Sequence, residues 1–174
     1  MKKQKTSKMN HIEIVNSKIQ DWSMLAETVS KWRKEGQKIV FTNGCFDILH
    51  LGHADYLARA ADLGTKLVVG LNSDLSVSRL KGAARPITDQ KSRGILLASM
   101  SFVDAVVLFE EDTPEKLIEL VCPDVLAKGG DYVTTEIVGH DFVTSKGGKV
   151  ITLPLIEGYS TTDIESRILK GHNK

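Results

Sequence analysis

The fold is decided by the stretch Phe41-Thr42-Asn43-Gly44-Cys45-Phe46-Asp47-Ile48-Leu49-His50-Leu51-Gly52-His53. Apolar residues 39–41 lead into it and predict a short buried strand, and a helical pattern over 51–63 follows it. The turn between strand and helix carries a glycine, a carboxylate and two histidines. A polar turn between a buried strand and a helix predicts an α/β fold with a functional site at this turn.

Composition limits the classes of protein that fit. The chain has 174 residues, with 41% hydrophobic residues, 26% charged residues and a net charge of +1, values typical of one soluble domain without a nucleic-acid partner. Its two cysteines, Cys45 and Cys122, lie in different segments and form no disulfide framework. No apolar run approaches the roughly 18 residues of a membrane span. We therefore expect a cytoplasmic protein without a membrane partner.

Apolar runs alternate with helical patterns along the chain. We expect a flexible tail over residues 1–20, a single domain over 21–174 and a mobile basic loop over 75–86. The expected strands are 38–42, 66–71, 103–109, 125–128 and 149–153, and the expected helices are 21–35, 51–63, 89–101, 112–121, 135–146 and 162–170. This order predicts a Rossmann-like, doubly wound sheet of five parallel strands, with helices on both faces and an extra N-terminal helix. That amphipathic first helix packs on the domain or on a second copy, and it favours a homodimer.

Ligands bind outside the carboxyl ends of the strands in such a sheet. Polar or small residues follow the first, second, fourth and fifth expected strands, and we expect them to converge on one rim. They are Asn43, Gly44, Cys45, Phe46, Asp47, His50 and His53; Asn72 and Asp74; Lys128, Gly129, Gly130 and Asp131; and Glu157, Gly158, Ser160, Thr161 and Thr162.

The segment His50-Leu51-Gly52-His53 places two imidazoles at the start of a helix. Backbone amides and the helix dipole favour a phosphate there, and Gly52 lets a ligand approach the backbone. Two donors at this point can stabilise charge on a reacting phosphorus. The alternatives are a metal-binding pair and two surface histidines. Metal sites more often add a cysteine or an acid at matched spacing.

Gly44-Cys45-Phe46-Asp47 followed by His50-Leu51-Gly52-His53 resembles the HxGH signature of the nucleotidylyltransferase superfamily. The second signature of that superfamily is a helix start rich in serine and threonine near the C-terminus. Glu157-Gly158-Tyr159-Ser160-Thr161-Thr162-Asp163-Ile164 stands in that place, although a plain helix cap would also explain it. The resemblance implies that this helix start holds the β- and γ-phosphates of a nucleotide.

Further segments resemble the adenylyltransferases of ADP-heptose synthesis, over about residues 37–169. They are 41–50, 72–74, 80–82, 85–87, 109–114 and 126–132. The resemblance implies transfer of AMP from ATP to D-glycero-β-D-manno-heptose 1-phosphate, giving ADP-heptose and pyrophosphate for lipopolysaccharide core precursors. It implies Mg²⁺ held mainly by the ATP phosphates, with no metal ligand from the protein. We expect the stand-alone form, without a sugar kinase half.

The same resemblance implies roles for individual residues. The catalytic set is His50, His53, Lys81 and Lys128. The nucleotide-binding set is Asn43, Gly44, Cys45, Phe46, Gly52, Arg93, Gly129, Ser160, Thr161 and Thr162. The substrate-binding set, for the sugar 1-phosphate, is Asp47, Asn72, Asp74, Arg85, Asp131 and Tyr132. Structural roles, as turn residue, cap or ion pair, stay open for Asp47, Asp74, Arg85 and Arg93.

The chain departs from glycerol-3-phosphate cytidylyltransferases at two positions. Ser101 and Leu155 stand where that family has arginines, and both differences weigh against CTP. The alternative function is a cytidylyltransferase or adenylyltransferase acting on another phosphorylated alcohol, such as glycerol 3-phosphate. A dinucleotide-binding module would show Gly-x-Gly-x-x-Gly after the first strand, which is absent. An RNA-binding relative of the synthetases would need a basic surface.

Overall fold

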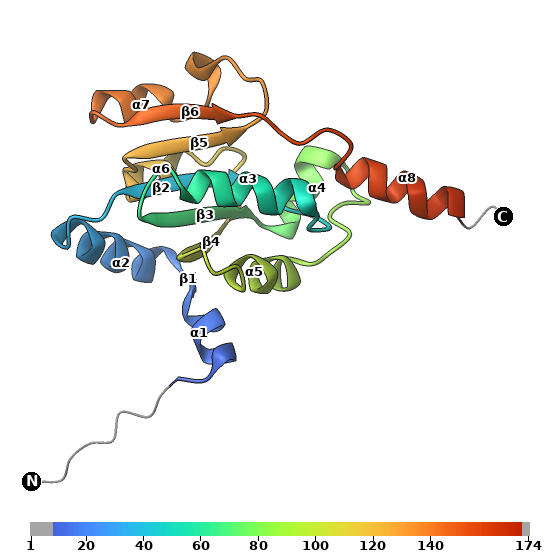
Figure 1. Cartoon of the computed structure of the whole chain (residues 1–174), viewed down its shortest axis with the longest axis horizontal. Helices are drawn as coiled ribbons and strands as arrows, with labels where there is room; N and C mark the ends of the chain where they lie inside the picture. The colour runs from blue at the N-terminus through green and yellow to red at the C-terminus, as the bar shows by residue number, and fades with distance from the viewer. Residues whose placement is uncertain (1–8, 172–174) are drawn as a thin grey trace, which may run out of the picture.

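Short apolar stretches of the chain pair into one parallel sheet covered by helices (Figure 1). The computed structural model describes residues 9–171. The strands are β1 (Ile19–Gln20), β2 (Ile39–Gly44), β3 (Lys66–Asn72), β4 (Ala105–Phe109), β5 (Val125–Gly129) and β6 (Lys149–Leu153). The helices are α1 (His11–Ser17), α2 (Trp22–Lys34), α3 (Leu51–Ala61), α4 (Asp74–Lys81), α5 (Gln90–Ala98), α6 (Glu115–Val121), the 3₁₀ turn η1 (Thr134–Glu136), α7 (His140–Ser145) and α8 (Thr161–Gly171).

The strand order is β1-β4-β3-β2-β5-β6, and every neighbouring pair is parallel. From β2 the chain adds β3 and then β4 on one side, and it returns to place β5 on the other side. The strand order therefore reverses between β2 and β5, the point at which a doubly wound sheet binds ligands. The prediction of a doubly wound parallel sheet is confirmed, but the sheet has six strands instead of five.

Alternating side chains of the strands fill two separate cores. Phe41 of β2 and Val68 of β3 face α2, α6 and α7, whereas Val40 and Val69 face α3 and α5. All four side chains are fully buried. A strand buried on both faces has no polar position, which is why these segments are continuous apolar runs in the sequence.

Part of the expected N-terminal tail is structured. Residues 10–20 form α1, capped by Asn10 and Glu13 in a capping box, and β1, which pairs with β4. The prediction of a flexible tail is therefore wrong for this part, and residues 1–8 lie outside the described residues. A two-residue strand carries too little periodicity to be recognised, which explains the missing sixth strand. The capping box of α1, by contrast, is a helix signal that the expected flexible tail left out.

The expected basic loop over 75–86 is also wrong in its first half. Residues 74–81 form α4, whose start is capped by the Ser73 hydroxyl accepting a hydrogen bond from the amide of Ser76. Val77 of this helix is fully buried. The capping serine and an acid in the first turn are signals of a helix, although the same residues also suit a polar turn at the end of a strand.

The helix expected over 135–146 is broken into η1 and α7. Gly139, between them, has φ +88°, and a Cβ there would lie 2.8 Å from Ile118 Cδ1. This left-handed residue interrupts the helix and lets the segment pass close to α6. The expected first helix, by contrast, is present as α2, and its apolar residues Leu25 and Val29 pack within the chain itself. This packing removes the basis for predicting a homodimer from α2.

Candidate active site

Two adjoining pockets lie where the strand order reverses. The strand pocket, of ≈ 160 Å³, lies between the carboxyl ends of β2 and β5 and is lined by Asn43, Gly44, Cys45, Phe46, Asp47, His53, Tyr56, Lys81, Lys128, Gly129, Leu155 and Thr161. The histidine pocket, of ≈ 450 Å³, is lined by His50, Gly52, His53, Tyr56, Lys81, Arg85, Leu155, Tyr159, Ser160, Thr161 and Thr162. Residues after three of the four expected strand ends, together with Lys81 and Arg85, thus surround one region, whereas Asn72 and Asp74 after the remaining strand do not line it.

The two histidines stack on each other at the start of α3. Their ring centroids lie 3.9 Å apart with an interplanar angle of 22°, and the ring of Phe46 meets His53 edge-on at 5.4 Å. Burial, helped by the nearby His50 and Lys81 and opposed by Asp47, lowers the pKa of His53 to about 4. Burial also lowers the pKa of His50, against the influence of Asp163. Both rings are therefore neutral near pH 7, and each can donate one N–H.

Neither histidine uses its Nδ1 within the described part of the chain. Both Nδ1 atoms are buried without a hydrogen-bond partner there. Buried polar atoms are nearly always paired in folded proteins. Both histidines line the histidine pocket, although the two unpaired Nδ1 atoms are themselves buried.

Cations surround the histidines. Lys128, at the end of β5, is half-buried and lies 3.5 Å from Asn43 Oδ1; burial lowers its pKa, and Cys45 opposes that effect. Lys81 ends α4 and lines both pockets. Arg85 lines the histidine pocket. Two lysines around neutral donors suit a polyphosphate, whereas Asp47 balances the charge of Arg85.

The start of α8 closes the histidine pocket. The Ser160 hydroxyl accepts a hydrogen bond from the amide of Asp163 at 3.0 Å and donates one to its carboxylate at 2.6 Å, and Thr161 Oγ1 donates to the Asp47 carbonyl at 2.9 Å. Gly52 is needed for this approach, because a Cβ there would lie 3.0 Å from the carbonyl oxygen of Tyr159. The amides of an eleven-residue helix thus open towards the histidines.

Asp47 is 1% exposed, and its carboxylate is fully engaged within the chain. It accepts hydrogen bonds from the amides of Ile87 and Thr88, from the Thr88 hydroxyl and from Arg85 Nε, at 2.7–2.9 Å. Burial alone would raise the pKa of Asp47, but these donors hold it well below its usual range. Asp47 thus lines the strand pocket as a fixed anion with its oxygens occupied.

Arg93, expected to bind the nucleotide, is 1% exposed and lines neither pocket. Its guanidinium donates to the carbonyls of Cys45 and Thr88 and pairs with Asp74 at 2.7 Å. The side chain therefore lies behind the turn after β2, where it joins three segments of the chain.

Four residues expected to bind the sugar also lie outside both pockets. Asn72 is buried and donates to the Ser76 hydroxyl at 2.9 Å. Asp74 pairs with Arg93, whereas Asp131 and Tyr132 are exposed in the turn after β5. Their substrate role remains a prediction from the resemblance.

The sequence did not single out Tyr56 or Tyr159, and it drew attention to Leu155 only for an absent arginine. Tyr56 lies one helical turn after His53, so its helical spacing could have placed it at the site. Its hydroxyl shares a 2.6 Å hydrogen bond with Thr42, and burial raises its pKa to about 12. Ser101 follows α5, before β4 begins, and lines neither pocket, so its bearing on the choice of nucleotide remains a prediction from the resemblance.

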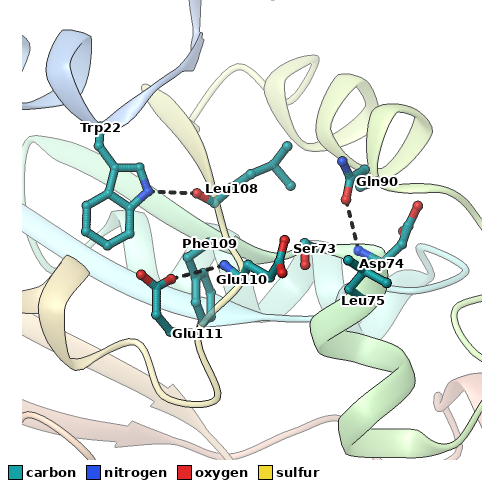
Figure 2. A pocket seen from close by; sticks show the side chains of 9 residues that line it. All are labelled: Trp22, Ser73, Asp74, Leu75, Gln90, Leu108, Phe109, Glu110 and Glu111. Atoms are coloured by element: carbon teal, nitrogen blue, oxygen red, sulfur yellow. Dashed lines mark hydrogen bonds between the residues drawn. The ribbon is translucent and has the colours of Figure 1, made fainter.

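A larger cavity, of ≈ 570 Å³, lies at the ends of β3 and β4 (Figure 2). Figure 2 shows the indole of Trp22 donating to the Leu108 carbonyl and the Gln90 side chain accepting from the Asp74 amide. The charged groups that line it are Asp74, Glu110 and Glu111. An anionic lining repels phosphates, so the smaller pockets beside the histidines are the better nucleotide site.

Comparison with known proteins agrees with this geometry. A solved structure of pantoate-beta-alanine ligase from Francisella tularensis shares the fold, with a TM-score of 0.59 over 84% of this chain and 75% of that chain, at 18% identity. A lipopolysaccharide core biosynthesis protein from Thermoplasma volcanium is 30% identical, with a TM-score of 0.57 over 72% of this chain and 100% of that chain. Both solved structures thus share the α/β fold on which the site lies.

The family follows from the sequence matches. The family model named cytidylyltransferase-like matches residues 41–167, so the chain belongs to the cytidylyltransferase-like family of nucleotidyltransferases. The bifunctional protein HldE of Magnetococcus marinus is 50% identical over 88% of this chain, and that of Halorhodospira halophila is 55% identical over 83%. These matches cover 31% and 30% of the two relatives, so the chain spans about a third of their length.

Among residues 9–171, no helix is both long and apolar enough to cross a membrane.

Proposed function

We propose that this chain transfers AMP from ATP to a sugar 1-phosphate, D-glycero-β-D-manno-heptose 1-phosphate, and releases pyrophosphate. The observation that carries the proposal is the stacked, neutral pair His50 and His53, with unused ring nitrogens, between Lys81, Lys128 and the start of α8. The sequence resemblance to adenylyltransferases of ADP-heptose synthesis and the similarity to HldE proteins support the choice of sugar.

The chemistry follows from where the charges lie. A phosphate oxygen of the sugar phosphate attacks the α-phosphorus of ATP, the new P–O bond forms, and the bond to the β-phosphate oxygen breaks as pyrophosphate leaves. His50 and His53 donate N–H groups to the α-phosphate oxygens as their charge changes. Lys81 and Lys128 balance the incoming and leaving phosphates, and the start of α8 holds the pyrophosphate. A phosphate is already a nucleophile, so orientation matters more than a general base.

Mg²⁺ fits this site as a companion of the triphosphate. No group of three or more His, Cys, Asp or Glu side chains within residues 9–171 is arranged to hold a metal ion. Mg²⁺ commonly binds substrate phosphates and water with few protein ligands, and it would neutralise phosphate charge there. The cytoplasmic location and the homodimer remain predictions; sedimentation of the purified protein tests the latter.

The decisive experiment measures pyrophosphate release with ATP or CTP, each paired with heptose 1-phosphate or glycerol 3-phosphate, in the presence of Mg²⁺. We expect release with ATP and heptose 1-phosphate. Release with CTP and glycerol 3-phosphate instead would replace the proposal by the cytidylyltransferase alternative. Replacing His53→Ala should lower kcat by roughly 100- to 1,000-fold, the usual effect of removing one donor to a charged transition state. A rate near that of the wild type would remove His53 from the mechanism.

A further inference from the structure

The turn after β2 has an unusual backbone. Phe46 and Ile48 have φ values of +47° and +46°, in the left-handed region, and neither is a glycine. This region is unfavourable for residues with a Cβ, and most unfavourable for a β-branched residue such as isoleucine. The residue between them is Asp47. Strained residues on both sides of Asp47 persist only where surrounding contacts hold them.

Asp47 provides those contacts. Thr88 donates to Oδ1 through its amide at 2.9 Å and its hydroxyl at 2.7 Å. Ile87 and Arg85 donate to Oδ2 at 2.9 and 2.8 Å. A carboxylate has about four lone-pair positions, and these donors fill them. Asp47 therefore has no free acceptor for a sugar hydroxyl, and it fastens the turn to residues 85–88.

Arg93 and Thr88 complete a closed ring of contacts around the turn. The Arg93 guanidinium donates to the Thr88 carbonyl at 3.0 Å and also to the Cys45 carbonyl. The Thr88 hydroxyl accepts from the amide of Ile48 at 3.3 Å. The turn is thus held before Phe46, at Asp47 and at Ile48. We call Asp47, Thr88 and Arg93 the turn clamp.

The clamped turn sets the position of a catalytic group. Phe46 meets His53 edge-on at 5.4 Å, and His53 stacks on His50. A Cβ on Gly44 would lie 3.1 Å from the Phe46 ring, so this ring fits closely against the end of β2. If Phe46 relaxed to an ordinary φ, its ring would leave His53 without this support.

We propose that Asp47, Thr88 and Arg93 are positioning residues, which hold the turn in its left-handed conformation so that Phe46 supports His53. Only the expected effect of these residues on the rate rests on the proposed function. It replaces the expectations that Asp47 binds the sugar and that Arg93 binds the nucleotide.

The test uses the full chain with Thr88→Val, which removes the hydroxyl but keeps the charge of Asp47. Thr65→Val is the matched control, because the Thr65 hydroxyl joins two segments through Lys38 at the opposite end of the sheet. We expect the nuclear Overhauser effect between the Phe46 and His53 rings to weaken in Thr88→Val and to persist in Thr65→Val. Thr88→Ser keeps the hydroxyl and should restore it. Equal ring contacts in Thr88→Val and Thr65→Val would overturn the inference.

Kinetics separate positioning from binding. In Asp47→Asn we expect kcat to fall at least 10-fold, with the KM for the sugar phosphate within about 2-fold of the wild type. A selective rise of that KM with kcat retained would make Asp47 a substrate ligand and overturn its positioning role. Asp104→Asn, which removes a carboxylate bonded to Leu67 and Lys66 away from the site, controls for lost stability. If Asp47→Asn does not fold, Thr88→Val decides. The ring contact needs no substrate, so it tests the clamp even if AMP transfer is not found.

Discussion

At the scale of single residues, His53 links the site to the stability of the fold. Its pKa is about 4 in the folded chain and about 6.5 in an unfolded one. Between these values the unfolded chain binds more protons than the folded chain. The contribution of neutral His53 to stability is therefore fully present above about pH 6.5 and is lost as the pH drops towards 4. We expect the free energy of unfolding to fall by about 2 kcal/mol over this range. This is less than the full shift of about two and a half pKa units would give, because the group is only half-buried.

Urea unfolding of the wild type and of His53→Gln at pH 7, 5.5 and 4.5 measures this loss. The variant should lack this part of the acid sensitivity. His11→Gln is the matched control, because His11 is exposed on α1, away from the site. Equal acid sensitivity in the wild type and in His53→Gln would show that His53 is not buried as a neutral ring.

The hydrogen bond between Tyr56 and Thr42 is the second test at this scale. Both side chains are buried, so Tyr56→Phe leaves the Thr42 hydroxyl without a partner and should cost about 1–2 kcal/mol of unfolding free energy. In the double variant Tyr56→Phe/Thr42→Val neither polar group remains. Its loss should be smaller than the sum of the two single losses, as measured by urea unfolding. Strict additivity would show that the 2.6 Å contact contributes no coupling.

The sequence predicted many of the residues that line the site, because a motif keeps them close together along the chain. His50, Gly52 and His53 belong to one helix start, and the structure gathers them in one pocket. The partners of Asp47 could not be predicted in this way. Thr88 lies 41 residues away, and no local pattern says which distant amides a carboxylate will meet.

At the scale of helices, two errors have local causes. The start of α4 depends on one serine cap, which also suits a turn. The interruption before α7 depends on one glycine, Gly139, which has a left-handed φ and lies close to Ile118 of α6. A cap can be recognised in a sequence, whereas a close approach of two helices needs their arrangement in space. The first error was avoidable and the second was not.

The position of α8 gives a prediction at the same scale. This helix has no buried residue and leads away from the sheet in Figure 1, so a few contacts at its start fix its place. In Gly52→Ala the new methyl would meet the Tyr159 carbonyl at 3.0 Å and the His50 ring at 3.1 Å. The start of α8 must then move away from the histidines. We expect kcat/KM to fall on the order of 100-fold, as small misplacements at active sites do.

Steady-state pyrophosphate assays and a thermal melt check this effect. The melting temperature should fall little, because α8 contributes no buried side chain. Gly171→Ala is the matched control: Gly171 ends the same helix, and a Cβ there meets nothing within 4 Å. If Gly52→Ala and Gly171→Ala had equal activity, the close approach of Tyr159 would have no part in forming the site.

At the scale of the whole molecule, the sequence predicted the strands better than their order. Continuous apolar runs marked β2 to β5, whose apolar side chains are largely buried on both faces, whereas the edge strand β6 is only partly buried. The reversal between β2 and β5 depends on which side of the sheet each connection crosses, and a single sequence does not contain that choice in any one segment. The polar strand ends nevertheless pointed to the right rim. All parallel strands end on one edge, whatever their order.

The N-terminal segment provides the last prediction. β1 adds to the sheet beside β4, with the Val106 amide donating to the Lys18 carbonyl at 2.8 Å, and α1 packs against α5. Deleting residues 1–20 removes the half-buried side chains of Val15 and Ile19 and uncovers the edge of β4 and the apolar residues against which they pack, so we expect a loss of about 2 kcal/mol of unfolding free energy. The active site lies on the other side of β3, between β2 and β5. The folded deletion variant should therefore keep kcat within about 2-fold of the wild type.

Urea unfolding and pyrophosphate release measure the two effects separately, and deletion of residues 1–8 is the control that leaves α1 and β1 in place. An unchanged stability after the longer deletion would show that α1 and β1 do not contribute to the fold.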